Sequence, residues 1–426
     1  MRIFEKLESE VRGYIRSFPT IFKSAKGSIL RDEQGVEFID FFAGAGTLNY
    51  GHNNEHVSKA LLEYIQNDGI IHGLDMATSA KKEFLQTFEE TILKPRNLEY
   101  KVQFTGPTGT NAVETALKLA RLVKQRSNVV AFTNGYHGLS QGSLAVTGNN
   151  QYRDESYISR INATFMPFCG YFGDFNTLEY FRKFIEDSSS GVDLPAAVIV
   201  ETIQGEGGIN VASKEWLQEL DSICKEFDIL LIIDDIQVGN GRSGEFFSFE
   251  DAGIYPDMVT LSKSIGGGLP MAVLLFKPHL DQWKPGEHTG TFRGNNLAFV
   301  ASKVLIETYW QNDNISKAVK YKEKILKESL ENIANKYKDS YDIKVRGRGL
   351  VYGFEIKDDK SMAACISKYA FEENLIVETC GSESQVVKFL PPLLIEEELL
   401  KEGLKRFEKA VDRLIIERSK NLKGEF

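Results

Sequence analysis

Two short apolar runs in the sequence each lead into a side chain that could take part in chemistry. The first, residues 229–233, is followed by Asp234, and the second, residues 258–261, is followed closely by Lys263. Both runs have the length and the β-branched composition of strands buried in a parallel sheet. Because α/β proteins bind ligands at the carboxyl ends of such strands, a carboxylate and an amine placed there predict a ligand site.

The amine has a specific chemical use at this position. An isolated lysine at a strand end is most often simply solvated, but Lys263 precedes three consecutive glycines, Gly266-Gly267-Gly268, which let backbone approach a ligand closely. Lysine loses its proton readily when it is desolvated or lies near other cations, and the free amine can attack an aldehyde and move protons. The Asp234 carboxylate could keep a nearby ring nitrogen protonated.

The same stretch contains a series of short motifs in order. They are Asp234-Asp235-Ile236-Gln237, Gly241-Arg242-Ser243-Gly244, Pro256-Asp257 and Ser262-Lys263. This series resembles the cofactor site of class III aminotransferases, which share fold type I of the pyridoxal-phosphate (PLP) enzymes. The resemblance implies that Lys263 bonds covalently to PLP, that Asp234 pairs with the pyridine nitrogen, and that Gln237 hydrogen-bonds the ring phenolate oxygen. PLP would then serve as an electron sink.

A second region of interest follows the strand predicted at residues 102–104. Small residues there open a helix whose unpaired N–H groups could hold a phosphate, and Asn111 and Glu114 have the spacing of a capping box. The nucleotide-binding pattern GxxxxGK(S/T) is absent, and an ordinary tight turn is the alternative. Together with the lysine and aspartate above, the region predicts Gly109 and Thr110 as phosphate ligands.

An aromatic residue between glycines follows the next predicted strand, in Gly135-Tyr136-His137-Gly138. Such an aromatic is commonly part of a core. The segment also resembles a family motif whose aromatic ring stacks on the pyridine ring of PLP. The resemblance implies this role for Tyr136 and a supporting role for His137.

Three further residues are expected near the substrate. Glu206 matches a family glutamate that pairs with an arginine and moves aside when a substrate carboxylate arrives. Lys388 stands where that arginine is expected and lacks its two-pronged geometry, although another basic residue could substitute. The loop from Gly44 to Thr47 begins like a dinucleotide fingerprint but lacks the third glycine, and the resemblance implies instead that Thr47 contacts the substrate.

A last motif, His288-Thr289-Gly290-Thr291, predicts self-association. In the family that it resembles, the hydroxyl of the second threonine reaches the cofactor phosphate of the neighbouring subunit. The resemblance therefore implies that Thr291 is a cofactor ligand across an interface and that the active unit is a homodimer or a larger homo-oligomer.

Length and composition are those of a globular protein. The chain has 426 residues, 42% hydrophobic and 26% charged, which predicts two or three structural units with a sizeable core. The net charge of −9 is mild and no basic stripe appears, so we expect no nucleic-acid partner. We also expect no membrane span and no signal peptide. Four scattered cysteines without a CxxC pair predict a cytoplasmic protein and no metal site.

The rhythm of the sequence predicts an α/β fold with a mostly parallel central sheet covered by helices. We expect an N-terminal segment at residues 1–55, a large PLP-binding domain at 56–310 and a small α+β C-terminal domain at 311–426. The N-terminal hairpin should pair residues 27–30 with 36–42. The predicted strands of the large domain are 102–104, 129–132, 196–200, 229–233, 258–261 and 273–276. The predicted helices are 56–66, 79–93, 111–125, 176–187, 212–226, 314–337, 361–372 and 396–420.

Longer stretches narrow the resemblance within the family. GAGTLNYGHNN, HGLDMATSAK, QFTGPTGTNAVE and TFRGNN resemble the diaminobutyrate–2-oxoglutarate aminotransferases of ectoine biosynthesis. The resemblance implies that the amino group of L-glutamate moves to L-aspartate 4-semialdehyde, giving 2-oxoglutarate and L-2,4-diaminobutyrate, a precursor of ectoine or of siderophores. The alternatives are another ω-aminotransferase, acting on 4-aminobutyrate, ornithine or lysine, and a PLP-dependent mutase or decarboxylase of the same fold.

Overall fold

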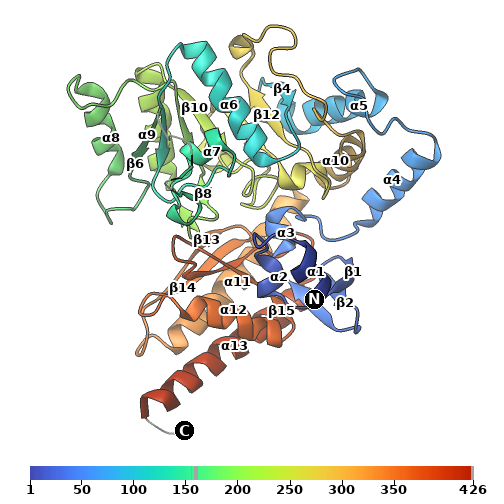
Figure 1. Cartoon of the computed structure of the whole chain (residues 1–426), viewed down its shortest axis with the longest axis vertical. Helices are drawn as coiled ribbons and strands as arrows, with labels where there is room; N and C mark the ends of the chain where they lie inside the picture. Colours follow the sequence, from blue (N-terminus) through green and yellow to red (C-terminus); the bar gives the residue numbers. More distant parts are fainter. Residues whose placement is uncertain (155, 158–161, 424–426) are drawn as a thin grey trace.

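The centre of the chain is a seven-stranded sheet. The computed structural model describes residues 1–154, 156–157 and 162–423, and the strand order is β4-β12-β11-β10-β7-β5-β6 (Figure 1). All pairings are parallel except those of β12, which runs antiparallel to β11 and β4. The strands are β4 (Lys101–Phe104), β5 (Val129–Phe132), β6 (Ala163–Met166), β7 (Ala197–Val200), β10 (Leu230–Asp234), β11 (Met258–Leu261) and β12 (Val273–Phe276). The predicted mostly parallel α/β fold is confirmed.

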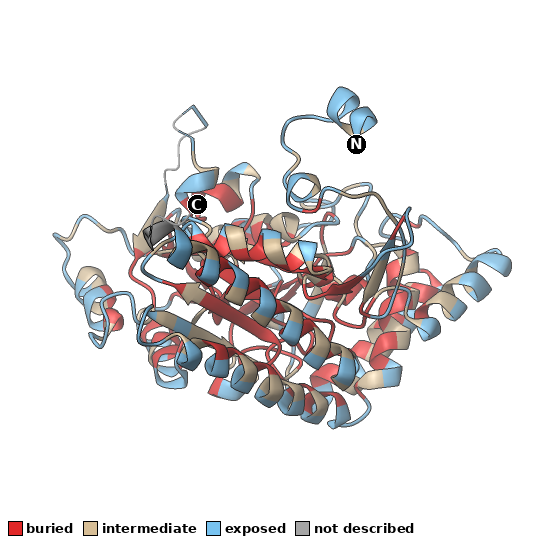
Figure 2. Ribbon diagram, turned by 90° about the horizontal axis from the view of Figure 1, so that it is seen from below, coloured by how far each residue is buried: buried red, intermediate tan, exposed pale blue. Residues whose placement is uncertain are grey.

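Both faces of this sheet are buried, which explains why its strands are continuous apolar runs. Every residue of β5, β7, β10, β11 and β12 is buried. Alternate residues of β10 pack into two different clusters: Leu231 and Ile233 into one, Leu230 and Ile232 into the other. Figure 2 shows the buried residues gathered on the sheet and on the helix faces turned toward it. Burial on both sides is the usual reason for such uninterrupted hydrophobic strands.

Helices cover the sheet on both sides. The helices of this region are α4 (Glu55–Gln66), α5 (Ser79–Phe88), α6 (Gly109–Lys124), α7 (Gln141–Ala145), α8 (Thr177–Glu186), α9 (Lys214–Glu226) and α10 (Asn296–Tyr309). Of these, α4 packs on α10 and α8 packs on α9. The predicted helix at 79–93 is α5 followed by a π-helical turn, η1 (Glu89–Leu93). Shorter elements are η2 (Lys94–Arg96), η3 (Asn150–Tyr152), η4 (Glu250–Ala252), η5 (Lys263–Gly266), η6 (Pro278–Leu280) and the two-stranded pair β8 (Ile203–Gln204) and β9 (Asn210–Val211).

The beginning of the chain pairs with a segment near its end. A four-stranded sheet has the order β1-β2-β3-β15, with β15 parallel to β3. Its strands are β1 (Phe22–Lys26), β2 (Ile29–Asp32), β3 (Glu37–Asp40) and β15 (Leu375–Ile376), and the short helices α1 (Arg2–Leu7), α2 (Tyr14–Ser17) and α3 (Ala43–Gly46) lie beside it. The predicted hairpin is present as β2 and β3, whereas β1 was not predicted. Phe18, Phe38 and Ile376 form a small apolar cluster that joins the two ends.

The rest of the C-terminal region is a mixture of helices and antiparallel strands (Figure 1). It contains α11 (Asn314–Lys336), β13 (Ile343–Arg348), β14 (Val351–Ile356), α12 (Met362–Glu372), β16 (Glu378–Cys380), β17 (Val386–Phe389) and α13 (Glu397–Lys423), with the sheet order β13-β14-β17-β16. The sequence predicted the three helices, and the run at residues 349–356 predicted a short strand that corresponds to β14, but the other strands were not predicted. The boundaries at residues 56 and 310 stay predictions. None of the helices described is long and apolar enough to cross a bilayer.

Candidate active site

A cavity of about 350 Å³ lies at the carboxyl ends of the central strands. It gathers side chains from segments that are far apart in the sequence, because each follows a different strand of the same sheet. Seven of the predicted site residues line it: Gly109, Thr110, Tyr136, Glu206, Asp234, Gln237 and Lys263. The remaining three, Thr47, Thr291 and Lys388, are outside its lining.

Lys263 occupies an unusual backbone conformation. It begins η5, directly after the strand β11 and Ser262, and its φ of 52° lies in the left-handed region that side chains other than glycine rarely adopt. Within the described residues, no hydrogen bond or ion pair to its Nζ is present. Burial, assisted by the charge of Lys388, lowers the pKa of Lys263. Strain and a lowered pKa are both typical of functional residues.

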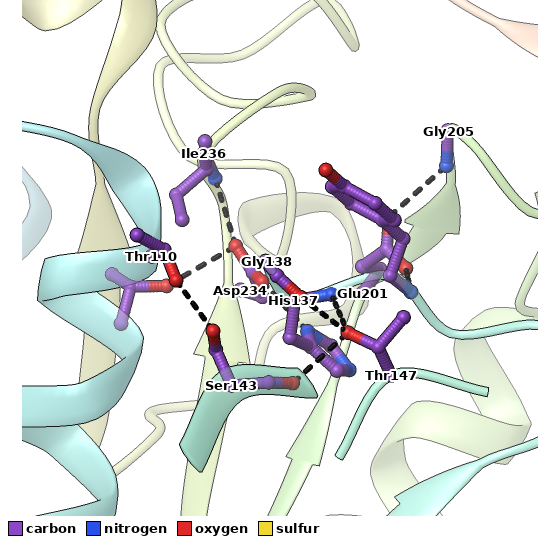
Figure 3. Close-up of polar contacts among 11 residues, drawn as sticks. Thr110, His137, Gly138, Ser143, Thr147, Glu201, Gly205, Asp234 and Ile236 are labelled. Atoms are coloured by element: carbon purple, nitrogen blue, oxygen red, sulfur yellow. Dashed lines mark hydrogen bonds and ion pairs between the residues drawn. The ribbon is translucent and has the colours of Figure 1, made fainter. Parts of the chain in front are cut away.

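Asp234 is held by a network of buried hydrogen bonds (Figure 3). Its Oδ2 lies 2.7 Å from Nδ1 of His137, and its Oδ1 accepts from the hydroxyl of Thr260 at 3.1 Å and from the backbone N–H of Ile236 at 3.2 Å. Burial lowers the pKa of His137, but its hydrogen bond to Asp234 and the charge of that carboxylate raise it further, above its ordinary value. His137 therefore contacts Asp234 directly, and its supporting role at a cofactor stays a prediction.

A second buried carboxyl group, Glu201, positions the residue predicted to stack on the ring. Its Oε1 accepts from the backbone N–H of Tyr136 at 2.9 Å, and its Oε2 accepts from the N–H of Gly205 at 3.0 Å. Burial raises the pKa of Glu201 to about 7. The sequence reasoning gave Glu201 no role, although its place directly after a buried strand was a usable signal.

The amino end of α6 has the form expected for an anion site. The capping box is formed by Thr108 and Asn111, so the predicted pair of Asn111 and Glu114 is wrong, because the helix begins earlier than predicted. The Thr110 hydroxyl lies 2.8 Å from that of Ser140 and also contacts that of Ser143. The first N–H groups of the helix, together with these hydroxyls, could bind a phosphate.

Glu114 has a different function from capping. Its Oε1 accepts from the Ser140 hydroxyl at 2.7 Å and from the backbone N–H groups of Gly142 and Ser143 at 2.8 and 3.1 Å. It thereby fixes the loop that faces Thr110. The Ile236 side chain also approaches Gly109 closely: an added Cβ would meet it at 2.9 Å, so a larger residue there would have to displace that side chain.

Gln237 lines the cavity, but its amide hydrogens are already engaged. Nε2 donates to the carbonyl of Ala45 and to Oε1 of Glu206, both at 3.1 Å. Its Oε1 is buried and has no hydrogen-bond partner among the described residues. A bond from Gln237 to a phenolate oxygen would therefore need one of these donors to be released, and a movement of Glu206 would release one.

Lys388 lies behind Glu206 as seen from the cavity. Its side chain is fully buried and its Nζ lies 2.6 Å from Oε1 of Glu206 and 2.9 Å from Oε1 of Glu378. Burial alone would lower the pKa of Lys388, but the two carboxylates raise it well above its ordinary value. Burial likewise raises the pKa of Glu206, and Lys388 and Lys263 overcome this and lower it to about 2. The structure thus places a cation where the sequence predicted one, together with a second carboxylate.

Two predicted residues lie away from the cavity. Thr47 is half-buried beside Gly267 and Gly268 and lines a different hollow, while its carbonyl accepts from the Ser264 hydroxyl at 3.1 Å. The loop that contains Thr47 is linked to the cavity by its Ala45 carbonyl, which accepts a hydrogen bond from the cavity residue Gln237. Thr291 is exposed, and its carbonyl lies 2.9 Å from Nε2 of His72. The roles of Thr47 and Thr291 stay predictions.

The carboxyl edge of one sheet thus holds three features: a lysine in strained backbone, a buried aspartate–histidine pair and a helix end suited to phosphate. Comparisons with known proteins agree with this arrangement. A family model for class-III aminotransferases matches residues 13–411. The chain belongs to this family, and the predicted family and enzyme class are confirmed.

Close relatives cover the chain almost completely. It is 61% identical over 419 residues to a diaminobutyrate–2-oxoglutarate transaminase of Wolinella succinogenes, covering 98% of this chain and 97% of that protein. It is 57% identical over 413 residues to a protein of the same name from Bordetella parapertussis, covering 96% and 95%. Among solved structures, an ornithine aminotransferase of Toxoplasma gondii, described with partial occupancy of PLP at its active site, has a TM-score of 0.84 at 24% identity, covering 98% and 95%. This last similarity concerns the fold alone.

Proposed function

We propose that the enzyme transfers the amino group of L-glutamate to L-aspartate 4-semialdehyde, giving 2-oxoglutarate and L-2,4-diaminobutyrate, a precursor of ectoine or of siderophores. The observation that carries this proposal is the identity of 61% to the Wolinella transaminase over nearly the full length of both chains.

The residues around the cavity fit PLP. A lysine amine with a lowered pKa, an aspartate, and a helix end with hydroxyl groups are available for the aldehyde, the ring nitrogen and the phosphate respectively. We propose that Lys263 holds the cofactor covalently, that Asp234 and Gln237 bind its ring, and that Gly109 and Thr110 bind its phosphate. When bound, PLP supplies an electron sink for charge that develops on the substrate carbon. Tyr136 would pack on the ring.

Lys263 is also the group that would move the proton. Because burial lowers its pKa, a larger fraction of its amine is free to accept the proton from the substrate carbon that carries the amino group. The hydrogen bond from His137 orients Asp234, whose negative charge would favour a protonated ring nitrogen. Each residue thus has a task that its surroundings in the structure support.

We propose that the Glu206–Lys388 pair controls the binding of substrate carboxylates. With Glu206 in place, the charge of Lys388 is neutralised at 2.6 Å. Movement of Glu206 away from Lys388 would leave the cation available to the carboxylate of glutamate. Lysine would act there as a point charge, in contrast to the two-pronged arginine.

The enzyme is further proposed to be a cytoplasmic homo-oligomer in which Thr291 contacts the cofactor phosphate bound by the neighbouring subunit. Thr291 is exposed on the loop that precedes α10, so a contact with another subunit is sterically feasible. The four cysteines are free thiols in this structure, which fits a reducing compartment.

The deciding experiment is a substrate panel with purified protein and added PLP. Diaminobutyrate, 4-aminobutyrate, ornithine and lysine are each offered with 2-oxoglutarate, and glutamate formation is measured. We expect the highest kcat/KM for diaminobutyrate, and equal or greater turnover of 4-aminobutyrate would refute the substrate assignment. A Lys263→Ala variant is the control: it should lack both transamination and the cofactor absorbance that borohydride reduction fixes to the wild-type protein. Turnover without any amino acceptor would instead indicate a mutase or a decarboxylase.

A further inference from the structure

Glu378 is a buried carboxylate that the proposed mechanism leaves without a task. It lies on β16 directly opposite Lys388 on β17, as a register pair of the antiparallel strands. Only 6% of Glu378 is exposed. Its Oε2 accepts from the hydroxyl of Tyr14 at 3.3 Å, so the amino-terminal helix α2 also approaches this position.

The group formed by Glu206, Lys388 and Glu378 is not balanced in charge. One ammonium lies between two carboxylates, at 2.6 and 2.9 Å, so the fully ionised group has a net charge of −1. The Oε1 atom of Glu378 is buried, and although it lies near Nζ of Lys388 it has no properly oriented hydrogen bond among the described residues. A buried acceptor with an uncompensated charge is costly unless a cation or a proton joins it.

The pair of Lys388 and Glu378 presents a cation and an anion side by side. An amino acid carries its α-carboxylate and α-ammonium on the same carbon, so it can be bound through both groups only where opposite charges lie adjacent. Glu206 separates this pair from the cavity, since it lines the cavity while Lys388 and Glu378 do not. Movement of Glu206 would let a substrate zwitterion reach both.

We propose that Glu378 determines specificity by accepting a hydrogen bond from the α-ammonium of aspartate 4-semialdehyde and of the diaminobutyrate formed from it, while Lys388 binds the α-carboxylate of the same molecule. The inference rests on the function proposed above. Glutamate reacts through its only amino group and therefore has no second ammonium for Glu378. The Glu378 carboxylate thus contacts the substrate only in the half-reaction that converts aspartate 4-semialdehyde to diaminobutyrate.

The state of Glu378 without substrate agrees with this assignment. Burial raises its pKa to about 7, although Lys388 opposes the shift and Glu206 reinforces it. The empty site therefore holds a proton near neutral pH for much of the time. An arriving ammonium replaces that proton as the compensating positive charge.

The test uses two amines that differ only in the relevant group, because 4-aminobutyrate is diaminobutyrate without its α-ammonium. The ratio of kcat/KM for diaminobutyrate to that for 4-aminobutyrate is measured for the PLP-loaded wild type and for Glu378→Gln. Loss of a hydrogen bond between charged groups should reduce this ratio roughly tenfold to a hundredfold. The kcat/KM for glutamate with an acceptor held constant should not fall, because loss of the Glu378 charge 2.9 Å from Nζ of Lys388 leaves that cation no less available to the glutamate carboxylate.

Two further variants make the result interpretable. Glu355→Gln removes a carboxylate from another ion pair of the same sheet, with Arg346, and should leave the ratio unchanged. Glu378→Asp keeps the negative charge on a shorter side chain and should reduce the ratio less than Glu378→Gln does. If Glu378→Gln does not fold, the ratio measured for Glu378→Asp tests the inference in its place.

The inference is wrong if the ratio is unchanged, or if the diamine and glutamate activities fall together, which indicates a purely structural role. A wild type that does not prefer diaminobutyrate would instead overturn the proposed function.

Discussion

Replacement of Glu378 by glutamine should change how stability depends on pH. In the folded protein the pKa of Glu378 is about 7, against an ordinary value of 4.5, and burial is the main cause. Between these two pH values the folded state binds the proton more tightly than the unfolded chain does. Stability therefore falls as the pH rises through this window, and the full cost is present above about pH 7.

The size of the effect follows from the two pKa values. A folded pKa of about 7 against 4.5 corresponds to about 3 kcal/mol of unfolding free energy. Glutamine does not titrate, so the stability of Glu378→Gln relative to wild type should increase by about 2.5 kcal/mol between pH 5 and pH 8, because part of the cost is already present at pH 5. Groups that titrate in both proteins cancel in the difference. Glu206, whose pKa is about 2, is ionised throughout this range.

The assay is urea unfolding of wild type and variant at pH 5, 6, 7 and 8, with equal cofactor and no substrate. The informative quantity is the difference in unfolding free energy between the two proteins at each pH. Glu355→Gln provides the matched control and should give a flat difference. If the difference for Glu378→Gln varies by less than about 1 kcal/mol, which is under one pKa unit, the reasoning about the buried charge is refuted.

Three other substitutions test separate parts of the site. Gly109→Ala places a Cβ 2.9 Å from Ile236 and should weaken PLP binding by disturbing the helix end, as measured by absorbance titration; unchanged affinity would argue against a phosphate site there. His137→Phe removes the 2.7 Å bond to Asp234 and should lower the rate of the glutamate half-reaction roughly tenfold or more in stopped-flow measurements. Thr291→Ala should reduce cofactor affinity by about tenfold if its hydroxyl binds phosphate, and no change would remove Thr291 from the site.

The central strands could be predicted almost to the residue, and the reason is physical. Strands such as β5 and β11 are buried on both faces, so their sequences are short apolar runs with clear ends. The strand β6, in contrast, has mostly half-buried residues at the edge of the sheet and gave no comparable signal. The antiparallel direction of β12 could not be predicted either, because an apolar run carries no information about its orientation.

The residues of the candidate site likewise divide into those that the sequence predicted and those that it did not. Residues that follow buried strands, such as Asp234 and Lys263, were found because the fold class itself places strand ends together. Glu378 was missed, because the short buried apolar run that precedes it, residues 375–377, was not recognised as a strand. Its signal was the hairpin: a turn centred near residue 383 sets Glu378 opposite Lys388. Which residues face each other across a hairpin depends on the register of its two strands, and neither strand of this hairpin was predicted.

The pairing of β3 with β15 has a consequence for folding during synthesis on the ribosome. β3 ends at Asp40, whereas its neighbour begins at Leu375. At about 5–20 residues per second, the nascent strand waits on the order of 20–70 s for its partner. During that time the ring of Phe38, which ends up against Ile376, is without its final cover. The apolar side chains of β3 are therefore incompletely covered during most of the synthesis of the chain.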